Sequence, residues 1–454
     1  MATVVTPPPA LNDQWPPSFW LPSQVTKLTH YQSSSVLPRE TVDVVVIGSG
    51  FSGASFVYHY TSGENSSKVV MLEARAVCSG ATARNGGHMA PNLLPINGSA
   101  AALKRARFER RNLDTVKALI NDNGIETALP NQSTEGSGWL LYRSAKEFEN
   151  AKRRLGHAVG ADREGLKIYN STEALHRTGL PAPLSGAIVH PSFPINTYEL
   201  SAWLLTQALA KGLLLYSDTP VTEVTKTDEG MYNVITPKGV VRTAKVVFAT
   251  NAYTNYFVED NNNSENTLSG MRTQVYPVRG QVSAHELIST DREDNSPISG
   301  TNLNWEDEYC VQLEQDDETT ASKKRYLVYG GCRRYGPEQQ VGPNFEDDNG
   351  IDSDVSSTLG DFFKSRVLPN GRAAPSTKKV KEWTGIMGFT KDGNPLVGQL
   401  KPNGNATNNG LYVLAGFGGH GVPRIFLSAQ ALVERYFSDN EQGWPEWFPD
   451  EYIN

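Results

Sequence analysis

The sequence predicts an α/β fold in which a discontinuous, Rossmann-like domain is assembled from separated segments and the segments between them build a second domain. Three observations predict this fold. An apolar, β-branched stretch over 42–47 runs into a glycine-rich turn and a helix-like stretch, and a second strand over 68–74 closes a βαβ unit. A further strand with its turn lies at 245–254, and an apolar strand at 411–415 enters a glycine-rich loop near the end of the chain.

The first glycine-rich turn reads VVVIGSGFSGASF and has the spacing G-x-G-x-x-G. Gly48 permits the tight turn from strand to helix, Gly50 lets the backbone approach a pyrophosphate, and Gly53 lets the helix pack closely on the strand. The helix is expected to begin near Phe51, so its free N–H groups, with Ser52 beside them, face the phosphates.

An acidic residue supports this interpretation. Glu73 ends the second strand twenty residues after Gly53, where a carboxylate can accept hydrogen bonds from a ribose. The glycine motif alone also occurs as a turn in ordinary α/β domains. The strand, glycines, helix and acid together favour a dinucleotide site.

The loop after Glu73 bears on which dinucleotide is bound. Residues 78–91 read CSGATARNGGHMAP, a composition typical of a loop that follows a ligand. A NAD-binding domain normally continues with further βαβ units, whereas a charged, helical stretch follows here. Near the C-terminus, Gly416, Gly418, Gly419 and Gly421 lead into a helix expected to start at Pro423, a favourable first-turn residue.

Composition narrows the possible partners and location. The chain has 454 residues and a formal charge of −7, which gives no reason to expect nucleic acid or an anionic membrane as a partner. Cys78, Cys310 and Cys332 form neither a disulfide framework nor a metal motif, which favours a reducing compartment. No apolar run is long enough for a membrane span. We expect a cytoplasmic monomer or small homo-oligomer without a metal ion.

These motifs, together with Pro277-Val-Arg-Gly-Gln281, Trp383-Thr-Gly-Ile-Met-Gly-Phe-Thr390 and Gly418-Gly-His-Gly421, occur in a characteristic order over roughly residues 40–440. In this combination the chain resembles the D-amino-acid-oxidase-like (DAO) family of flavoenzymes, nearest to its γ-glutamylputrescine oxidase, sarcosine oxidase and glycine oxidase members. The resemblance implies a Rossmann-like FAD-binding domain and a second domain with a mixed β-sheet, of the α+β type, that covers the flavin.

The resemblance also implies domain ranges and cofactor contacts. FAD binding is assigned to 40–92, 191–252 and 366–440, substrate binding to 93–190 and 253–365, an extended arm to 1–39 and a tail to 441–454. The expected FAD contacts are Gly48, Gly50, Phe51, Ser52, Gly53, Glu73, Ala74, Arg75, Ser79, Arg84, Asn85, Gly86, Gly87, His88, Val224, Thr250, Asn251, Gly388, Gly418, Gly419, His420, Gly421 and Val422.

Two departures from the family pattern affect the chemistry. Some relatives attach flavin to a cysteine in the strand that here reads EWTGIMGF, which has none, so we expect non-covalent FAD. His88 is the alternative attachment residue. Sarcosine oxidases place a lysine over the flavin, and this sequence has no clear equivalent; Lys323 and Lys324 lie just outside the corresponding strand.

The resemblance implies oxidation of a C–N bond in an amine or amino acid. Hydride transfer to flavin N5 would give an imine that hydrolyses, with O2 as acceptor and H2O2 as product. A dehydrogenase that passes electrons to a quinone or carrier protein is one alternative, and a NAD-dependent dehydrogenase or non-catalytic nucleotide-binding protein is another.

Five side chains are candidates for the reacting end of the site. His88 and His420, each after a Gly-Gly pair, are the catalytic candidates, although a lone histidine is often structural. Arg334 is expected to bind a substrate carboxylate, with a surface role beside Arg333 as the alternative. Tyr329 and Trp383 are candidates for pocket walls, with core packing as the alternative. Arg424, a cation in a helix's first turn, calls for a partner such as FAD or substrate.

Overall fold

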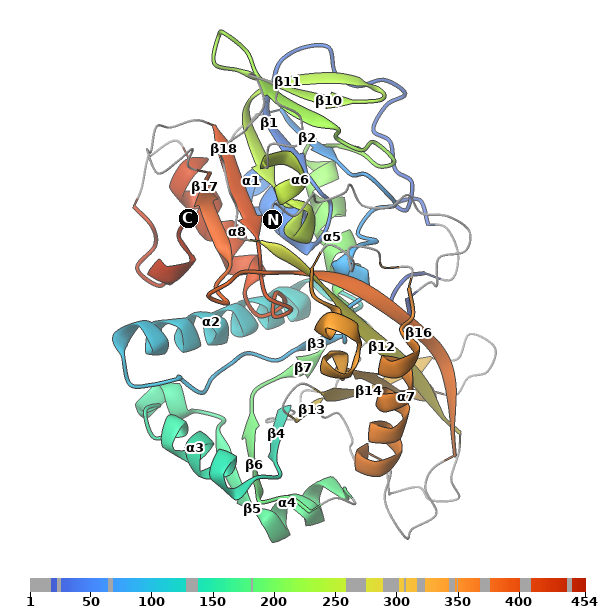
Figure 1. The fold of residues 1–454 in the computed structure, drawn as a ribbon. Helices are drawn as coiled ribbons and strands as arrows, with labels where there is room; N and C mark the ends of the chain where they lie inside the picture. The colour runs from blue at the N-terminus through green and yellow to red at the C-terminus, as the bar shows by residue number, and fades with distance from the viewer. Residues whose placement is uncertain are drawn as a thin grey trace.

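The computed structural model describes most of the chain, and the arrangement of its elements is shown in Figure 1. The described residues are 18–22, 26–63, 68–127, 138–180, 183–258, 275–288, 302–305, 308–316, 323–342, 348, 350–367, 376–400, 410–438 and 443–454. Two eight-stranded sheets organise these residues, and a short two-stranded sheet lies beside them.

The first sheet carries the predicted βαβ unit. Its main path runs β17 (Leu396–Gln399), β18 (Leu411–Ala415), β11 (Gly239–Phe248), β1 (Val42–Ile47), β2 (Val69–Leu72) and β8 (Leu214–Tyr216). All neighbours from β18 to β8 are parallel, β17 is antiparallel to β18, and β10 (Tyr232–Thr236) with β9 (Glu223–Lys226) extends β11 as an antiparallel ribbon. The helices α1 (Phe51–Ser62), α5 (Thr197–Ala210) and α8 (Ile425–Tyr436) pack together, α1 between the other two.

Strand β1 forms because its β-branched side chains can be buried on both faces of the sheet. Val44 and Val46 join the core that includes residues of α1, α5 and α8, whereas Val45 and Ile47 join a second core on the opposite face. This double burial fixes the strand, and therefore fixes the turn that follows it at Gly48.

The second sheet is mixed, as predicted. Its order is β16 (Ser376–Phe389), β12 (Tyr276–Ile288), β15 (Lys323–Gly330), β14 (Tyr309–Asp316), β13 (Asn302–Asn304), β4 (Gly138–Tyr142), β6 (Gly186–His190) and β5 (Lys167–Asn170). Only the β13–β4 pair among these described strands is parallel. The other α-helices in the described part of the chain are α2 (Ala100–Asn123), α3 (Ala145–Leu155), α4 (Ser171–Thr178), α6 (Asn255–Val258) and α7 (Ser353–Phe362). The short two-stranded sheet consists of β3 (His88–Met89) paired with β7 (Phe193–Pro194).

The predicted fold class is confirmed, and the segments alternate between the two sheets as expected for a discontinuous domain. In Figure 1 the first sheet occupies the upper part of the molecule, the second sheet the lower part, and α2 lies between them. The range 366–440, assigned to FAD binding, contributes to both sheets, because β16 pairs with β12 whereas β17 and β18 join the first sheet. The domain division therefore remains a prediction. No helix in the described ranges is long and apolar enough to cross a membrane.

Candidate flavin and substrate site

A cavity of about 570 Å³ lies between the two sheets, beyond the carboxyl ends of β1, β2 and β11. In open α/β sheets ligands bind at this end of the strands. Eighteen of the predicted FAD contacts line it. They are Gly48, Gly50, Phe51, Ser52, Glu73, Ala74, Arg75, Arg84, Asn85, Gly86, His88, Thr250, Asn251, Gly418, Gly419, His420, Gly421 and Val422.

The glycine turn has the close approaches that its spacing predicts. Gly48 has φ +101°, and a Cβ there would lie 2.7 Å from the Ala249 carbonyl oxygen. A Cβ on Gly53 would lie 2.0 Å from the Gly48 oxygen, so glycine lets α1 pack on β1, and Gly53 itself does not line the cavity. Gly50 is the N-cap of α1 without a side-chain cap, and the first turn contains no acidic residue. An anion is therefore well placed at this helix end.

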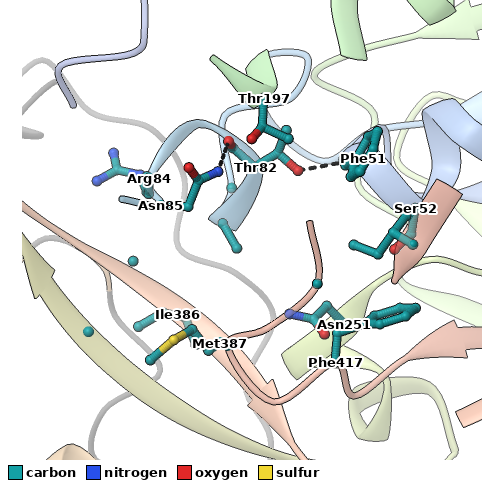
Figure 2. Close-up of a pocket in the computed structure, with 18 of the residues that line it drawn as sticks. Phe51, Ser52, Thr82, Arg84, Asn85, Thr197, Asn251, Ile386, Met387 and Phe417 are labelled. Atoms are coloured by element: carbon teal, nitrogen blue, oxygen red, sulfur yellow. Dashed lines mark hydrogen bonds between the residues drawn. The ribbon is translucent and has the colours of Figure 1, made fainter. Parts of the chain in front are cut away.

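The loop after Glu73 reaches back to α1 through Thr82, which the sequence analysis did not select. The Thr82 hydroxyl oxygen accepts a hydrogen bond from the Phe51 N–H at 2.8 Å, and the Asn85 side-chain amide donates to the Thr82 carbonyl at 2.7 Å. Figure 2 shows both bonds on one wall of the cavity. The available sequence signal was a hydroxyl side chain two residues before the RNGGH stretch.

Glu73 holds the turn as well as facing the cavity. Its Oε2 accepts hydrogen bonds from the Ser49 N–H at 2.9 Å and the Ser49 hydroxyl at 2.7 Å, and its Oε1 accepts from the Arg75 N–H at 2.9 Å. The carboxylate is thereby fixed at the end of β2, at the position expected for a ribose contact.

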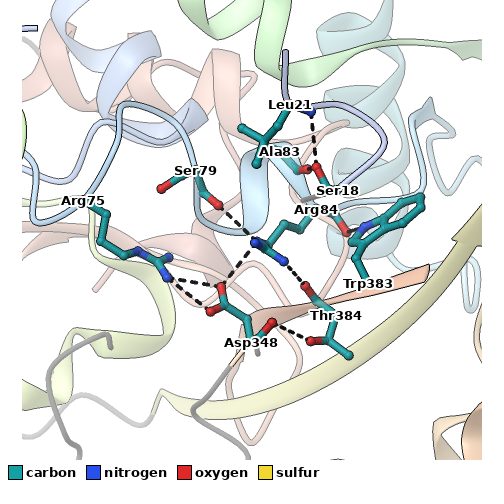
Figure 3. Close-up of polar contacts among 9 residues, drawn as sticks. All are labelled: Ser18, Leu21, Arg75, Ser79, Ala83, Arg84, Asp348, Trp383 and Thr384. Carbon is teal, nitrogen blue, oxygen red and sulfur yellow. Dashed lines mark hydrogen bonds and ion pairs between the residues drawn. The ribbon is translucent and has the colours of Figure 1, made fainter. Parts of the chain in front are cut away.

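A buried ionic cluster supports the same loop. Arg75 and Arg84 both contact Asp348, with Arg75 Nη1 3.2 Å from Asp348 Oδ1 and Arg84 Nε 3.5 Å from Oδ2 (Figure 3). Arg84 also donates to the Thr384 carbonyl at 2.8 Å and to the Ser79 carbonyl at 3.2 Å. The cluster ties the cavity loop to β16 in the second sheet, and it gives Ser79 a supporting position outside the cavity lining.

The C-terminal glycine loop closes the opposite wall. Asn251, at φ +44°, accepts a hydrogen bond from the Gly416 N–H through its side-chain oxygen at 3.1 Å. The Gly418 N–H donates to the Gly388 carbonyl at 2.8 Å. Gly388 supports the loop but does not line the cavity. A Cβ on Gly388 would lie 2.7 Å from Asn251 Oδ1, so glycine is needed for this close contact.

A buried carboxylate from α2 anchors this loop. Glu109, only 2 % exposed, receives His420 Nε2 at 2.8 Å on Oε2 and Arg424 Nε at 2.8 Å on Oε1. Burial alone raises the pKa of Glu109, but the His420 and Arg424 charges and the hydrogen bonds from His420 and the Asn92 N–H outweigh it and lower the pKa to about 2. Glu109 is therefore the partner of Arg424, in place of FAD or substrate, and α8 begins at Ile425, two residues after the predicted start.

The second sheet and the 84–88 loop meet at the far end of the cavity. Tyr309 lines this end and packs against His88, with ring centroids 5.0 Å apart. A Cβ on Gly86 would lie 2.2 Å from the Tyr309 ring, so glycine at this position admits the tyrosine. Burial lowers the pKa of His88 to about 4, which leaves its imidazole neutral at physiological pH.

The predicted substrate residues lie elsewhere. Trp383 and Tyr329 are fully buried in core clusters, so both side chains have the core-packing role that was the alternative to forming pocket walls. Arg334 pairs with Glu308 at 3.2 Å, and its neighbour Arg333 lines the cavity instead. Arg333 lies over the Phe389 ring at 5.2 Å. The left-handed turn at Cys332 (φ +57°) directs the chain here, and no sequence pattern distinguishes the two arginines.

Two predicted cofactor contacts also have other surroundings. Val224 on β9 belongs to the core of the first sheet, whereas Pro220 and Val221 line the cavity. Gly87 does not line the cavity, because its outer side meets the Trp20 ring. Among the described residues that line the cavity there is neither a cysteine nor a lysine.

The cavity fits a dinucleotide of the FAD type. Its volume lies within the range of cofactor sites. The glycine cradle and uncapped N-terminus of α1 suit a pyrophosphate, Glu73 suits a ribose, and the N-terminus of α8 again has neither a side-chain cap nor an acidic first turn.

Comparison with known proteins decides the family. A family model for FAD dependent oxidoreductases (DAO) matches residues 43–435. The chain belongs to this family. FAD is thus the cofactor of the family, as predicted, and a NAD-dependent enzyme or a non-catalytic nucleotide-binding protein is set aside.

Individual relatives agree with this assignment. The chain is 25 % identical to gamma-glutamylputrescine oxidoreductase of Escherichia coli over 410 residues, covering 88 % of this chain and 85 % of the relative. It is 22 % identical to the probable oxidoreductase OrdL of Haemophilus influenzae over 430 residues, covering 91 % and 86 %. Glycine oxidase from Geobacillus kaustophilus shares the fold, with a TM-score of 0.68, 20 % identity, and coverage of 91 % of this flavoenzyme and 98 % of that chain.

Proposed function

We propose that this flavoenzyme oxidises the C–N bond of an amine or amino acid, with O2 as the electron acceptor and H2O2 as a product. The cavity carries the proposal, because one end has the features of a dinucleotide cradle and the other is formed by His88, Tyr309 and Arg333. The relatives named for γ-glutamylputrescine and glycine support a nitrogen-bearing substrate.

The residues of the first sheet would hold the cofactor. Gly48 and Gly50 would admit the pyrophosphate at the N-terminus of α1, and Glu73 would accept hydrogen bonds from the ribose. Pro220 and Val221, which line the cavity shortly before the predicted Val224, would contact the adenosine end. Bound non-covalently, FAD would supply a two-electron acceptor for hydride removal from the carbon next to nitrogen, giving an imine that hydrolyses.

Arg333 would recognise an anionic group of the substrate. Its guanidinium lines the cavity over Phe389, and within the described residues it forms no ion pair, unlike Arg334. A guanidinium can donate two parallel hydrogen bonds to a carboxylate. A substrate that carries both an amine and a carboxylate would therefore be oriented with its nitrogen-bearing carbon toward the interior of the cavity.

The two histidines would act on the substrate's nitrogen. An amine loses a hydride readily only as the free base. A buried site disfavours the charged ammonium form of the substrate and therefore assists the reaction. His88 is neutral and can accept a hydrogen bond from the amine. His420, held by Glu109, would bind or position the substrate from the opposite loop.

A peroxide-release assay over a panel of amines and amino acids tests the proposal. H2O2 formed in proportion to substrate consumed supports an oxidase. Turnover that requires a quinone or carrier protein, without peroxide, would support the dehydrogenase alternative. No flavin reduction by any amine or amino acid under anaerobic conditions would contradict the proposed substrate class. The cytoplasmic location and the monomeric or small oligomeric state remain predictions.

A further inference from the structure

A short N-terminal segment, residues 18–22, packs on the outer side of the cavity loop 82–88. Trp20 is only 3 % exposed, and its indole N–H donates a hydrogen bond to the Asn85 carbonyl at 2.6 Å. The Ser18 hydroxyl donates to the Ala83 carbonyl. Both carbonyls belong to the loop whose inner side, through Thr82, Arg84 and Asn85, lines the cavity.

The contact between Trp20 and the loop is close. A Cβ on Gly87 would lie 2.1 Å from Trp20 Cζ2, and Gly87 has φ +76°. Any larger residue at this position would displace the indole ring or the loop. The residues before and after it, Gly86 and His88, both line the cavity. Glycine at 87 is thus explained by the tryptophan behind it.

The same segment is held by the second sheet, so the loop is clamped between two supports. Lys381 Nζ donates to the Ser18 carbonyl at 3.2 Å, and Trp20 shares a core cluster with Trp383 and Val282. From its side of the loop, Trp383 donates its indole N–H to the Arg84 carbonyl at 3.0 Å. Figure 3 shows Ser18, Ala83, Arg84 and Trp383 in this arrangement.

We propose that residues 18–22 act as a clamp that holds loop 82–88 in the conformation that binds FAD, with Trp20 as a positioning residue. The clamp lies outside the cavity, because the described lining residues begin at Ile47. The clamp holds the loop ordered before FAD binds. Binding therefore costs less conformational entropy, and the affinity for FAD is higher. This inference rests on the proposed role of loop 82–88 in holding FAD.

Titration of the deflavinated full-length protein with FAD, followed by flavin fluorescence, tests the clamp. Trp20→Phe keeps an aromatic ring but loses the N–H donor, and should raise the Kd for FAD about tenfold. Trp20→Ala should raise it further, and Ser18→Ala provides a milder second variant if Trp20→Ala does not fold. The unfolding midpoint of each apo protein is measured beside the Kd.

Trp139→Phe is the matched control, since Trp139 is 8 % exposed in the second sheet, stacks on Tyr169, and does not line the cavity. It should lower stability while leaving the Kd unchanged. Wild-type affinity in both Trp20 variants, or an equal change in Trp139→Phe, would overturn the clamp. Failure of the wild-type chain itself to bind FAD would instead overturn the proposed cofactor site.

Discussion

Glu109 Oε2 and His420 Nε2 lie 2.8 Å apart, although the two residues are 311 positions apart in the sequence. Because the pKa of Glu109 is lowered to about 2, the carboxylate is ionised at neutral pH and can only accept a hydrogen bond. Nε2 of His420 must therefore carry a proton. The pair fixes the orientation of an imidazole that lines the cavity and joins α2 to the C-terminal glycine loop.

Replacing Glu109 by glutamine should destabilise the protein by about 3 kcal/mol at pH 7, because Arg424 and His420 then lose the charge of their buried partner. Urea unfolding measures the change. Glu149→Gln is the control, since Glu149 pairs with Lys152 on an exposed face of α3. Equal stability of Glu109→Gln and wild type would contradict the role assigned to the pair.

The same variant should change the pH dependence of stability. The pKa of Glu109 is about 2 in the folded protein, against an ordinary value of 4.5. Its stabilising contribution is therefore complete above about pH 4.5 and is lost as the pH falls toward 2. Unfolding curves of Glu109→Gln should lack this part of the acid sensitivity.

His420→Ala should slow substrate-dependent flavin reduction about 10- to 100-fold while FAD remains bound. Anaerobic stopped-flow absorbance measures the rate. His285→Ala serves as the control, because His285 stacks on Phe363 and does not line the cavity. Unchanged reduction by His420→Ala would restrict His420 to a structural role.

Gly50→Val should abolish FAD binding, because a side chain at this position would occupy the space expected for the phosphates and already meets Thr82 Oγ1 at 3.0 Å from its Cβ. Gly63→Val is the control. Gly63 lies at the other end of the same helix, has φ −69°, and a Cβ there would have no contact closer than 3.7 Å. The control should bind FAD normally. A fully flavinated Gly50→Val protein would show that the pyrophosphate lies elsewhere.

Arg333→Met should raise KM for substrates with a carboxylate about 100-fold or more, since a charge-assisted bidentate contact is lost. Arg334→Met should have little effect on KM, because Arg334 pairs with Glu308. Steady-state kinetics with a carboxylate substrate and its amide analogue distinguish the two. Equal effects of the two substitutions would remove Arg333 from the substrate site.

His190 should make stability fall between pH 6.5 and 4. Burial lowers its pKa from 6.5 to about 4, and the side chain is 3 % exposed. As the pH falls, His190 is protonated in the unfolded chain before it is protonated in the folded protein. The free energy of unfolding therefore falls by an amount on the order of 3 kcal/mol. His190→Asn should flatten this part of the pH profile in thermal unfolding, and His176→Asn, at an exposed position of α4, is the substitution control. The same slope in His190→Asn and wild type would contradict the assignment.

The sequence predicted the first βαβ unit closely because local patterns determine it. The run over 42–47 forms β1 at those bounds, and the helix begins at Phe51 as expected. Gly48 and Gly53 have the close backbone contacts that their spacing implies. Such features depend on residues that are close together in the sequence, so the spacing of a motif can predict them.

The missed residues depend on tertiary contacts. Arg333 and Arg334 are neighbours, and only the turn at Cys332 decides which one faces the cavity. Glu109 lies one and two turns before Leu113 and Val116 on the buried side of α2, a spacing that could have marked it as a buried acid. Trp20 stood in a proline-rich arm with no pattern to show that it would pack behind Gly87.

Release and reconstitution of the flavin tests whether the cavity between the two sheets holds FAD. We expect a yellow protein that releases about one equivalent of FAD on acid precipitation and, once deflavinated, binds FAD again. A colourless protein that takes up no FAD when it is supplied would show that the cavity is not a flavin site.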